Sequence, residues 1–269
     1  MKYRVVAAAI ALLSYSAMAG SIEFVPLQQR AQGHSLAGAS LLNDSLFSNP
    51  ASAAFTNVYS VDGTVLSPQT FSVSVLDTRT SGMGGALGYY RIARPGVAQA
   101  IQVGKLGVTG KVGQNFGFGV AGKAAWGPDL AGTSAHYNDV DLGISFKFDR
   151  LQLGMNVNNV FGGSAAMGEG REYSTGGRVN WEDTMYLSVA VSGDVDTLNL
   201  TQVGVGAEYV SPHFFALKGG FRTRPIDQRS YWGGGFSILS PRVSLHYAVE
   251  IENRSGGTTE HSVGSTFLF

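Results

Sequence analysis

From residue 58 onward, apolar and polar residues alternate with a period of two along much of the chain. The pattern is clearest in residues 242–252, where the apolar positions are Val243, Leu245, Tyr247, Val249 and Ile251. Successive side chains of a β-strand point to opposite faces. The pattern therefore predicts strands with one apolar and one polar face. The polar face consists mainly of Gly, Ser, Thr, Asn and Gln, with few of the Lys and Glu residues that a water-exposed sheet carries.

The alternating segments are about ten residues long, the length with which a tilted strand crosses a bilayer. Lipid offers no partner for open sheet edges, so membrane strands must close into a barrel. We therefore expect an all-β fold, a transmembrane antiparallel β-barrel of fourteen strands. The predicted strands are 58–67, 70–78, 83–92, 97–112, 116–126, 138–148, 151–160, 173–181, 184–193, 199–210, 213–223, 229–239, 242–251 and 258–269. Merging or losing one hairpin gives twelve strands, which stays open as the alternative.

The predicted connections form two alternating sets. The tight ones are 79–82, 113–115, 149–150, 182–183, 211–212 and 240–241. The longer ones include 127–137, 161–172, 194–198, 224–228 and 252–257. Short periplasmic turns and longer extracellular loops are typical of outer-membrane barrels.

Aromatic residues lie near many of the predicted strand ends, where a membrane barrel carries its interfacial girdles. For any one of them, ordinary core packing is an equal alternative. They are Tyr59, Tyr89, Tyr90, Trp126, Trp181, Tyr186, Tyr209, Phe214, Phe215, Tyr231 and Trp232.

The N-terminus has the three parts of a secretory signal peptide. Lys2 and Arg4 precede an apolar run at 5–13, and Ala17-Met18-Ala19 is an A-x-A cleavage site. The apolar run is too short to span a membrane as a helix. We expect residues 1–19 to be removed, and the mature chain to reach the outer membrane of a Gram-negative-type bacterium.

Composition excludes several classes of protein. Charged residues make up 14% of the 269 residues, whereas a soluble domain carries about 25%. Intrinsic disorder requires low hydrophobicity and high net charge, but 44% of the residues are hydrophobic and the net charge is zero. The absence of cysteine excludes disulfides, thiolate metal sites and cysteine nucleophiles. A nucleic-acid partner is not expected, because no basic excess exists to bind one.

Motifs of catalysis and cofactor binding are weak. Residues 117–123 match G-x-G-x-x-G by letter, but no helix can follow them, since Trp126-Gly127-Pro128 ends the segment. The five histidines show no metal-ligand spacing. We expect no enzyme, no cofactor and no metal. A lipid-active enzyme stays open as a third hypothesis, and it requires a Ser and a His within hydrogen-bond reach.

Charged residues that share the parity of the Gly/Ser/Asn face are candidates for lining the lumen, where charges tune selectivity. Pairing with each other or with a plug is an equal alternative. These candidates are Lys105, Lys111, Lys123, Lys147, Glu208, His246, Glu250 and Glu252. Glycine on this face leaves room for close backbone approach. It therefore favours a filled lumen.

Residues 20–57 do not alternate, and we expect them to form a separate segment before the barrel at 58–269. Within this segment, 30–55 reads as short helical turns that Asn49-Pro50 interrupts. Its Gly38-Ala39, Asn43-Asp44 and Asn49-Pro50-Ala51 resemble the N-terminal segment of the FadL-type family of outer-membrane proteins. The family also includes PorV-like secretion-associated barrels.

Segments 206–209, 215–222, 233–236 and 245–248 are similar to the closing strands of FadL relatives. The final strand ends on Phe269, like the terminal strand that the barrel-insertion machinery recognises. The resemblance implies a luminal plug, gated around Asn49, Pro50 and Ala51, and passive transport of small hydrophobic compounds such as fatty acids. Outer-membrane lipid, the insertion machinery and a hydrophobic small molecule are the implied partners. The alternative is a non-transporting structural or secretion-associated barrel, with a homo-oligomer left open.

Overall fold

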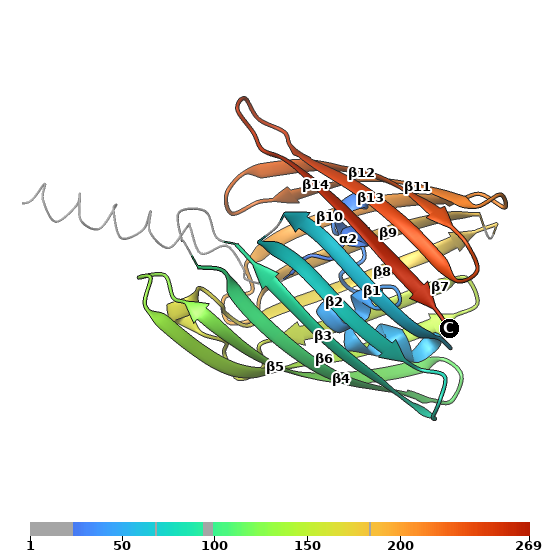
Figure 1. The fold of residues 1–269 in the computed structure, drawn as a ribbon, viewed down its shortest axis with the longest axis horizontal. Helices are drawn as coiled ribbons and strands as arrows, with labels where there is room; N and C mark the ends of the chain where they lie inside the picture. Colours follow the sequence, from blue (N-terminus) through green and yellow to red (C-terminus); the bar gives the residue numbers. More distant parts are fainter. Residues whose placement is uncertain (1–23, 68, 94–98, 183) are drawn as a thin grey trace, which may run out of the picture.

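A closed antiparallel barrel of fourteen strands forms the body of the molecule (Figure 1). The computed structural model describes residues 24–67, 69–93, 99–182 and 184–269. Each strand pairs with its neighbours in the chain, and β1 pairs with β14 to close the barrel. The strands are β1 (Tyr59–Ser67), β2 (Thr70–Asp77), β3 (Met83–Ile92), β4 (Ile101–Val112), β5 (Phe116–Pro128), β6 (Ser134–Phe148), β7 (Leu151–Asn158), β8 (Glu172–Trp181), β9 (Met185–Asp194), β10 (Leu200–Val210), β11 (Phe215–Arg224), β12 (Arg229–Leu239), β13 (Val243–Glu252) and β14 (Thr259–Leu268). The prediction of fourteen strands is confirmed, and the alternative of twelve is wrong.

The exterior of the barrel is an apolar belt. Its side chains are the apolar members of the alternating strands, as Leu106, Val205 and Leu245 illustrate with exposures of 63%, 48% and 52%. A soluble protein does not expose a continuous apolar surface of this kind, whereas a transmembrane barrel requires one. Among the described residues, no helix is long and apolar enough to cross a membrane.

The two sets of connections lie at opposite ends of the barrel. The turn end carries the short connections and Phe269, whose backbone N–H bonds the carbonyl oxygen of Tyr59. The loop end carries the longer connections, of which 159–171 is the longest within the described residues. One predicted loop is wrong: β5 and β6 continue to the pair Pro128–Ser134, so 127–137 shrinks to 129–133. Backbone pairing continues there although the apolar alternation has faded.

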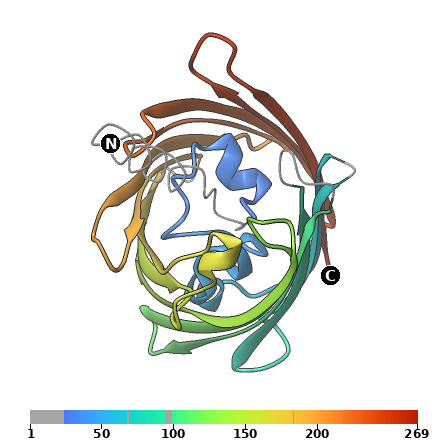
Figure 2. The same ribbon diagram turned by 90° about the vertical axis from the view of Figure 1, so that its left-hand side faces the viewer.

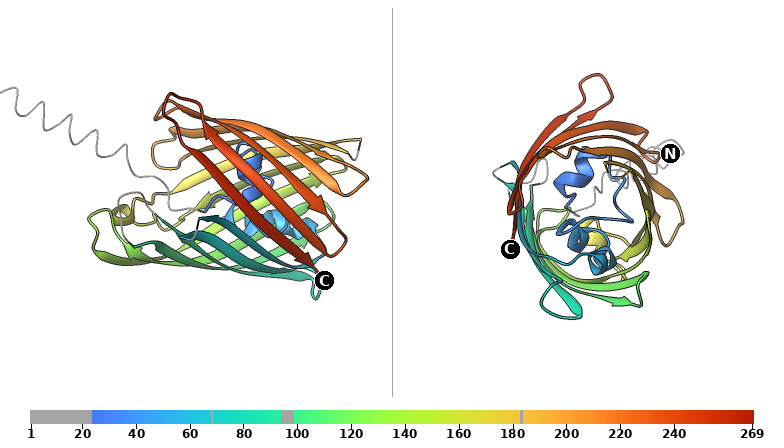
Figure 3. Two further views of the ribbon diagram at one scale, coloured as in Figure 1. Left: turned by 45° about the horizontal axis from the view of Figure 1, so that its top comes forward. Right: turned by 90° about the vertical axis from the view of Figure 1, so that its right-hand side faces the viewer.

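Residues 24–57 lie inside the barrel, as Figure 2 shows in blue. This plug consists of α2 (Leu27–Ala31), α3 (Asp44–Phe47) and the 3-10 helix η2 (Pro50–Phe55). It runs from the loop end, where Phe24 lies, to the turn end, where β1 begins (Figure 3). The predicted luminal plug is confirmed; the predicted signal peptide lies outside the described residues.

Candidate functional site

The plug rests directly on glycines of the barrel wall. A Cβ atom on Gly154 would lie 1.9 Å from the carbonyl oxygen of Gly38, and one on Gly204 would lie 2.2 Å from that of Gly33. A Cβ on Gly119 would lie 2.4 Å from the backbone of Pro50 and Ala51. Any side chain at these wall positions would push the plug away. The glycines of the inner face therefore let the plug fill the lumen, as the sequence predicts.

Residues 117–123 belong to this wall. They lie in β5, where Gly117 and Gly119 face the plug and Phe118 and Val120 face outward. The strand interpretation of the glycine motif is therefore correct.

The predicted hatch residues are part of this contact, where they lie against Gly119 and Gly143 of the wall. Asn49 is completely buried, and its side-chain oxygen accepts the N–H of Ala51. Its side-chain amide donates to the carbonyl oxygens of Gly38 at 2.7 Å and Ile144 at 3.1 Å, and Met155 lies at the 3.5 Å limit. One side chain thus joins the plug to itself, to β6 and to β7.

A packed cluster of buried apolar side chains, the apolar chamber, lies in the lumen between the plug and strands β3 to β6. Three rings form its centre: Phe24, Phe47 and Tyr90, with each pair of ring centroids 5.7 Å apart. The other buried members of this chamber are Leu46, Ile101, Val103, Ala121, Ala125, Tyr137 and Met167.

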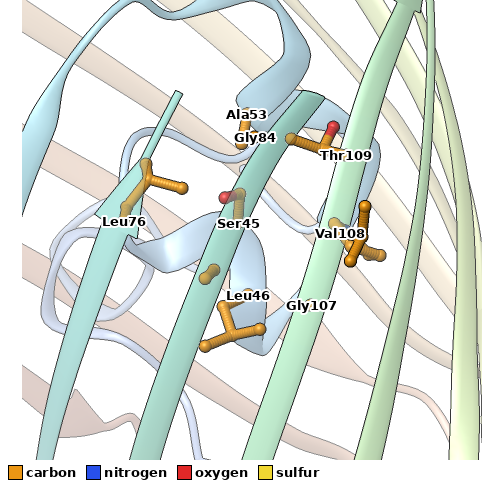
Figure 4. Close-up of a pocket in the computed structure, with 10 residues that line it drawn as sticks. Ser45, Leu46, Ala53, Leu76, Gly84, Gly107, Val108 and Thr109 are labelled. Carbon is orange, nitrogen blue, oxygen red and sulfur yellow. The ribbon is translucent and has the colours of Figure 1, made fainter. Parts of the chain in front are cut away.

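Beside the chamber, a small cavity of about 10 Å³ lies between the plug and the wall at β2 to β4 (Figure 4). Leu46 and Ala53 of the plug line it, together with Gly107 and Val108 of β4. Val108 is 44% exposed on the barrel exterior. Only a thin layer of the wall therefore separates this cavity from the lipid side.

The loop end holds a second, larger cavity, the vestibule, of about 830 Å³. Its floor includes Arg30 and His34 of the plug, and its walls carry charged residues of β8 and β11 to β14. Arg222 makes a bidentate pair with Glu250 at 2.8 Å and stacks on Tyr231. Glu250 also lies 3.7 Å from Arg30 and 3.4 Å from His34. The vestibule is thus polar and contrasts with the apolar chamber.

His34 is neutral in this surrounding. Burial and the positive charge of Arg222 together lower the pKa of His34 to about 4, against the raising effect of Glu250. The plug is therefore attached to β11 and β13 with an uncharged imidazole at neutral pH.

On the opposite side of the lumen, two lysines share one carboxylate. The Nζ atoms of Lys105 and Lys123 lie 2.8 and 2.9 Å from the two carboxylate oxygens of Asp141. All three side chains are buried. Paired buried charges of this kind fix the wall, and they do not line an open aqueous channel.

A chain of hydrogen bonds follows the inner wall from β1 to β8. Asp62 accepts from Thr266, which contacts Nε2 of His246 at 3.1 Å, and Nδ1 of His246 lies 2.8 Å from Ser237. Lys218 donates to Ser237 at 2.6 Å. The chain continues through ion pairs of Glu208 with Lys218 and Arg178.

The Ser237–His246 pair meets the distance condition of the enzyme hypothesis. Ser237 has no exposed surface, however, and neither it nor His246 lines the vestibule or the small cavity. A nucleophile needs access to its substrate, so this pair supports the wall. The described residues contain no cluster of His, Asp and Glu suited to a metal ion.

Most of the predicted lumen-lining residues face inward. Lys105, Lys123, Glu208, His246, Glu250 and Glu252 are buried there. Lys111 and Lys147 are exposed, because they lie where β4 and β6 end at the turn end of the barrel. The buried six are paired or hydrogen-bonded, which agrees with the alternative that they hold the plug and wall together.

The aromatic residues divide between the two faces. Trp126, Trp181, Tyr209, Phe215 and Trp232 are exposed on the exterior. In contrast, Tyr90 and Tyr231 are buried in the lumen, and Tyr186 lies under the guanidinium of Arg178. The girdle interpretation is therefore wrong for these three.

Sequence patterns did not single out Phe24, Phe47 or Met167. The plug does not alternate, and Met167 is a lone methionine in a Gly/Ala-rich loop. No local signal separates such a residue from an exposed loop position.

No family model matches the chain, and no curated protein matches it. Solved structures do. The CymD monoaromatic hydrocarbon channel has 12% sequence identity and a TM-score of 0.71, with 91% of this chain and 97% of that one covered. The P. putida toluene transporter TodX has 9% identity and a TM-score of 0.69, with 93% and 99% covered. A Pseudomonas aeruginosa FadL homologue has 13% identity and a TM-score of 0.64, with 90% and 98% covered. The chain has the FadL-type barrel fold.

Proposed function

We propose that the protein passes small hydrophobic compounds across the outer membrane by passive transport. The observation that carries this proposal is the apolar chamber, because a barrel lumen that served only water-soluble solutes would have no reason to hold buried aromatic rings. The turn end then faces the periplasm and the loop end faces the outside, following the usual asymmetry of such barrels. Similarity in fold to hydrocarbon channels supports the same substrate class. Fatty acids are one candidate substrate within it.

Passage requires a local shift of the plug. The hatch around Asn49, Pro50 and Ala51 lies next to the small cavity, of which Pro50 is a lining residue. A shift of this turn connects the chamber with the wall at β2 to β4. No covalent step and no cofactor take part.

A second candidate function is a structural or secretion-associated barrel without transport. The close contact between the plug and the glycines of the wall favours this second function, since it leaves the lumen filled. The two functions differ in whether the protein binds a hydrophobic ligand at all.

The deciding experiment is a binding and uptake screen. Detergent-solubilised protein is titrated with labelled palmitate, toluene and glucose, and cells with an intact outer membrane are assayed for uptake of the same compounds against an empty vector. We expect binding and accelerated uptake of palmitate or toluene, and none of glucose. Failure to bind or take up either hydrophobic probe would leave the structural function.

A further inference from the structure

Met167 lies on an outer loop, yet its side chain is completely buried. It belongs to the short helix η3 (Ala165–Met167) of the loop between β7 and β8, which Figure 2 shows in yellow, folded into the barrel. The other methionines that follow the predicted cleavage site, Met83, Met155 and Met185, are 52%, 46% and 43% exposed. Met167 is thus the methionine of the described chain that lies in the apolar chamber.

Carboxylates of the lumen hold this loop inward. Asp139 of β6 accepts the N–H groups of Phe161 at 3.0 Å and Gly163 at 2.8 Å, and Asp141 accepts that of Asn159 at 3.0 Å. Hydrogen bonds to ionised acceptors are stronger than neutral ones. The neighbouring loop adds a bond from the N–H of Leu130 to the carbonyl oxygen of Ala166. These hydrogen bonds therefore fix the inward position of Met167.

Met167 is completely buried and lines neither the vestibule nor the small cavity. Beyond the vestibule, the small cavity at β2 to β4 holds about 10 Å³, whereas an engineered cavity of about 150 Å³ is one that accepts benzene in a protein interior. A solute that passes from the vestibule into the chamber must therefore displace a side chain. Methionine is flexible, and its thioether makes favourable contacts with aromatic rings. An apolar ring can therefore replace it among the apolar side chains of the cluster.

Access to this position runs through the vestibule. Phe24 and Phe47 line the vestibule and are also members of the chamber. Gly168, which follows Met167 in the chain, also lines the vestibule. A solute that reaches the two rings from outside therefore arrives beside the loop that carries Met167. Charged solutes remain in the vestibule, where Arg and Glu side chains are available, because the chamber offers apolar surface.

We propose that Met167 occupies the binding site of the transported solute, an uncharged apolar compound about as large as one aromatic ring, and that the solute binds by displacing the Met167 side chain. The inference rests on the proposed function and adds the residue that sets the size of the solute. A smaller residue at 167 then admits larger compounds, and a bulkier one excludes them.

The first test compares uptake of toluene and naphthalene by cells that carry the wild type, Met167→Ala, Met167→Trp or the control Met185→Ala. We expect Met167→Ala to raise naphthalene uptake at least threefold, Met167→Trp to abolish toluene uptake, and Met185→Ala to behave as the wild type. Met167→Leu, of similar volume, keeps the test informative should the tryptophan variant fail to insert. Unchanged selectivity in Met167→Ala would overturn the inference.

The second test observes the displacement. Protein labelled with ¹³C-methyl methionine gives signals from the residues at 83, 155, 167 and 185 once the signal peptide is removed. Toluene should shift the Met167 methyl signal and leave the other three in place. If the wild type takes up toluene without a change at Met167, the inference is wrong and the transport function stands. If cells with the wild type take up palmitate but neither toluene nor naphthalene, the inference fails and the transport function stands. If they take up none of the three compounds, the inference and the transport function both fail.

Discussion

The side-chain amide of Asn49 donates a hydrogen bond to the backbone carbonyl of Ile144, 3.1 Å away, and so joins the plug to the barrel wall across 95 positions of sequence. The same amide bonds Gly38 within the plug. Asn49 therefore links the plug to the wall through hydrogen bonds, in addition to its place in the predicted hatch.

Replacing Asn49 should weaken the contact between the plug and the wall. Asn49→Ala leaves buried carbonyl groups without their donor, which costs about 1–3 kcal/mol. We expect a lower free energy of unfolding and faster entry of small sugars in liposome-swelling assays. Asn115→Ala is the matched control, because Asn115 also donates to a backbone carbonyl, that of Lys147, but is exposed. Equal behaviour of the two variants would contradict the assignment.

The sequence predicts the barrel well and the lumen poorly. Strand number and the two ends follow from alternation and loop length, because these are local properties of the chain. Alternation fails at 127–128 and 134–137, where the hairpin of β5 and β6 continues past the point at which apolar residues mark its outer face. Hydrogen bonding extends a strand there without any hydrophobic signal.

The contacts of the plug could not be derived in the same way. That Gly38 would lie on Gly154 and Gly176 depends on the register of strands more than a hundred residues away. The alternation of side chains along each strand placed the buried charged residues on the inner face. It could not show which carboxylate forms ion pairs with Lys105 and Lys123. Those pairings depend on how the barrel closes.

The body of the plug should be fixed during transport. Ser35 and Ser188 have their hydroxyl oxygens 2.6 Å apart, and the chain contains no cysteine. The double variant Ser35→Cys, Ser188→Cys therefore allows one disulfide between plug and β9. We expect its oxidised and reduced forms to take up hydrophobic probes equally well, with each single variant as the control. Loss of uptake on oxidation would mean that the whole plug moves.

Lysine on the exterior should report whether the belt lies in lipid. Leu106 lies in the middle of β4 and is 63% exposed. A Lys at the bilayer midplane of a barrel costs about 2–4 kcal/mol, so Leu106→Lys should lower the unfolding free energy in lipid vesicles by that amount. Leu198→Lys, on a loop at the end of the barrel, should have almost no effect. A similar small change in both variants would argue against membrane insertion in this orientation.

The carboxylate of Asp141 should be needed for the fold of the β4–β6 wall. Asp141→Asn leaves the ammonium groups of Lys105 and Lys123 buried without that charge partner. Breaking a buried ion pair costs about 3–5 kcal/mol. The exposed pair of Arg171 and Asp196 supplies the control, since Asp196→Asn should cost about 0–1 kcal/mol. The measurement is urea unfolding of both variants in detergent, and equal midpoints would refute the prediction.

Acid should loosen the contact between the plug and strands β11 and β13. Burial and the charge of Arg222 lower the pKa of His34 to about 4, below its ordinary value of 6.5. Between these two values the unfolded chain binds a proton that the folded chain does not, so stability falls as the pH falls from about 6.5 to 4, by up to about 3 kcal/mol. His34→Gln should make this slope shallower by the contribution of His34, whereas His213→Gln, in the connection between β10 and β11, preserves it. The measurement is the unfolding free energy at several pH values, and a slope in His34→Gln as steep as that of the wild type would contradict the assignment to His34.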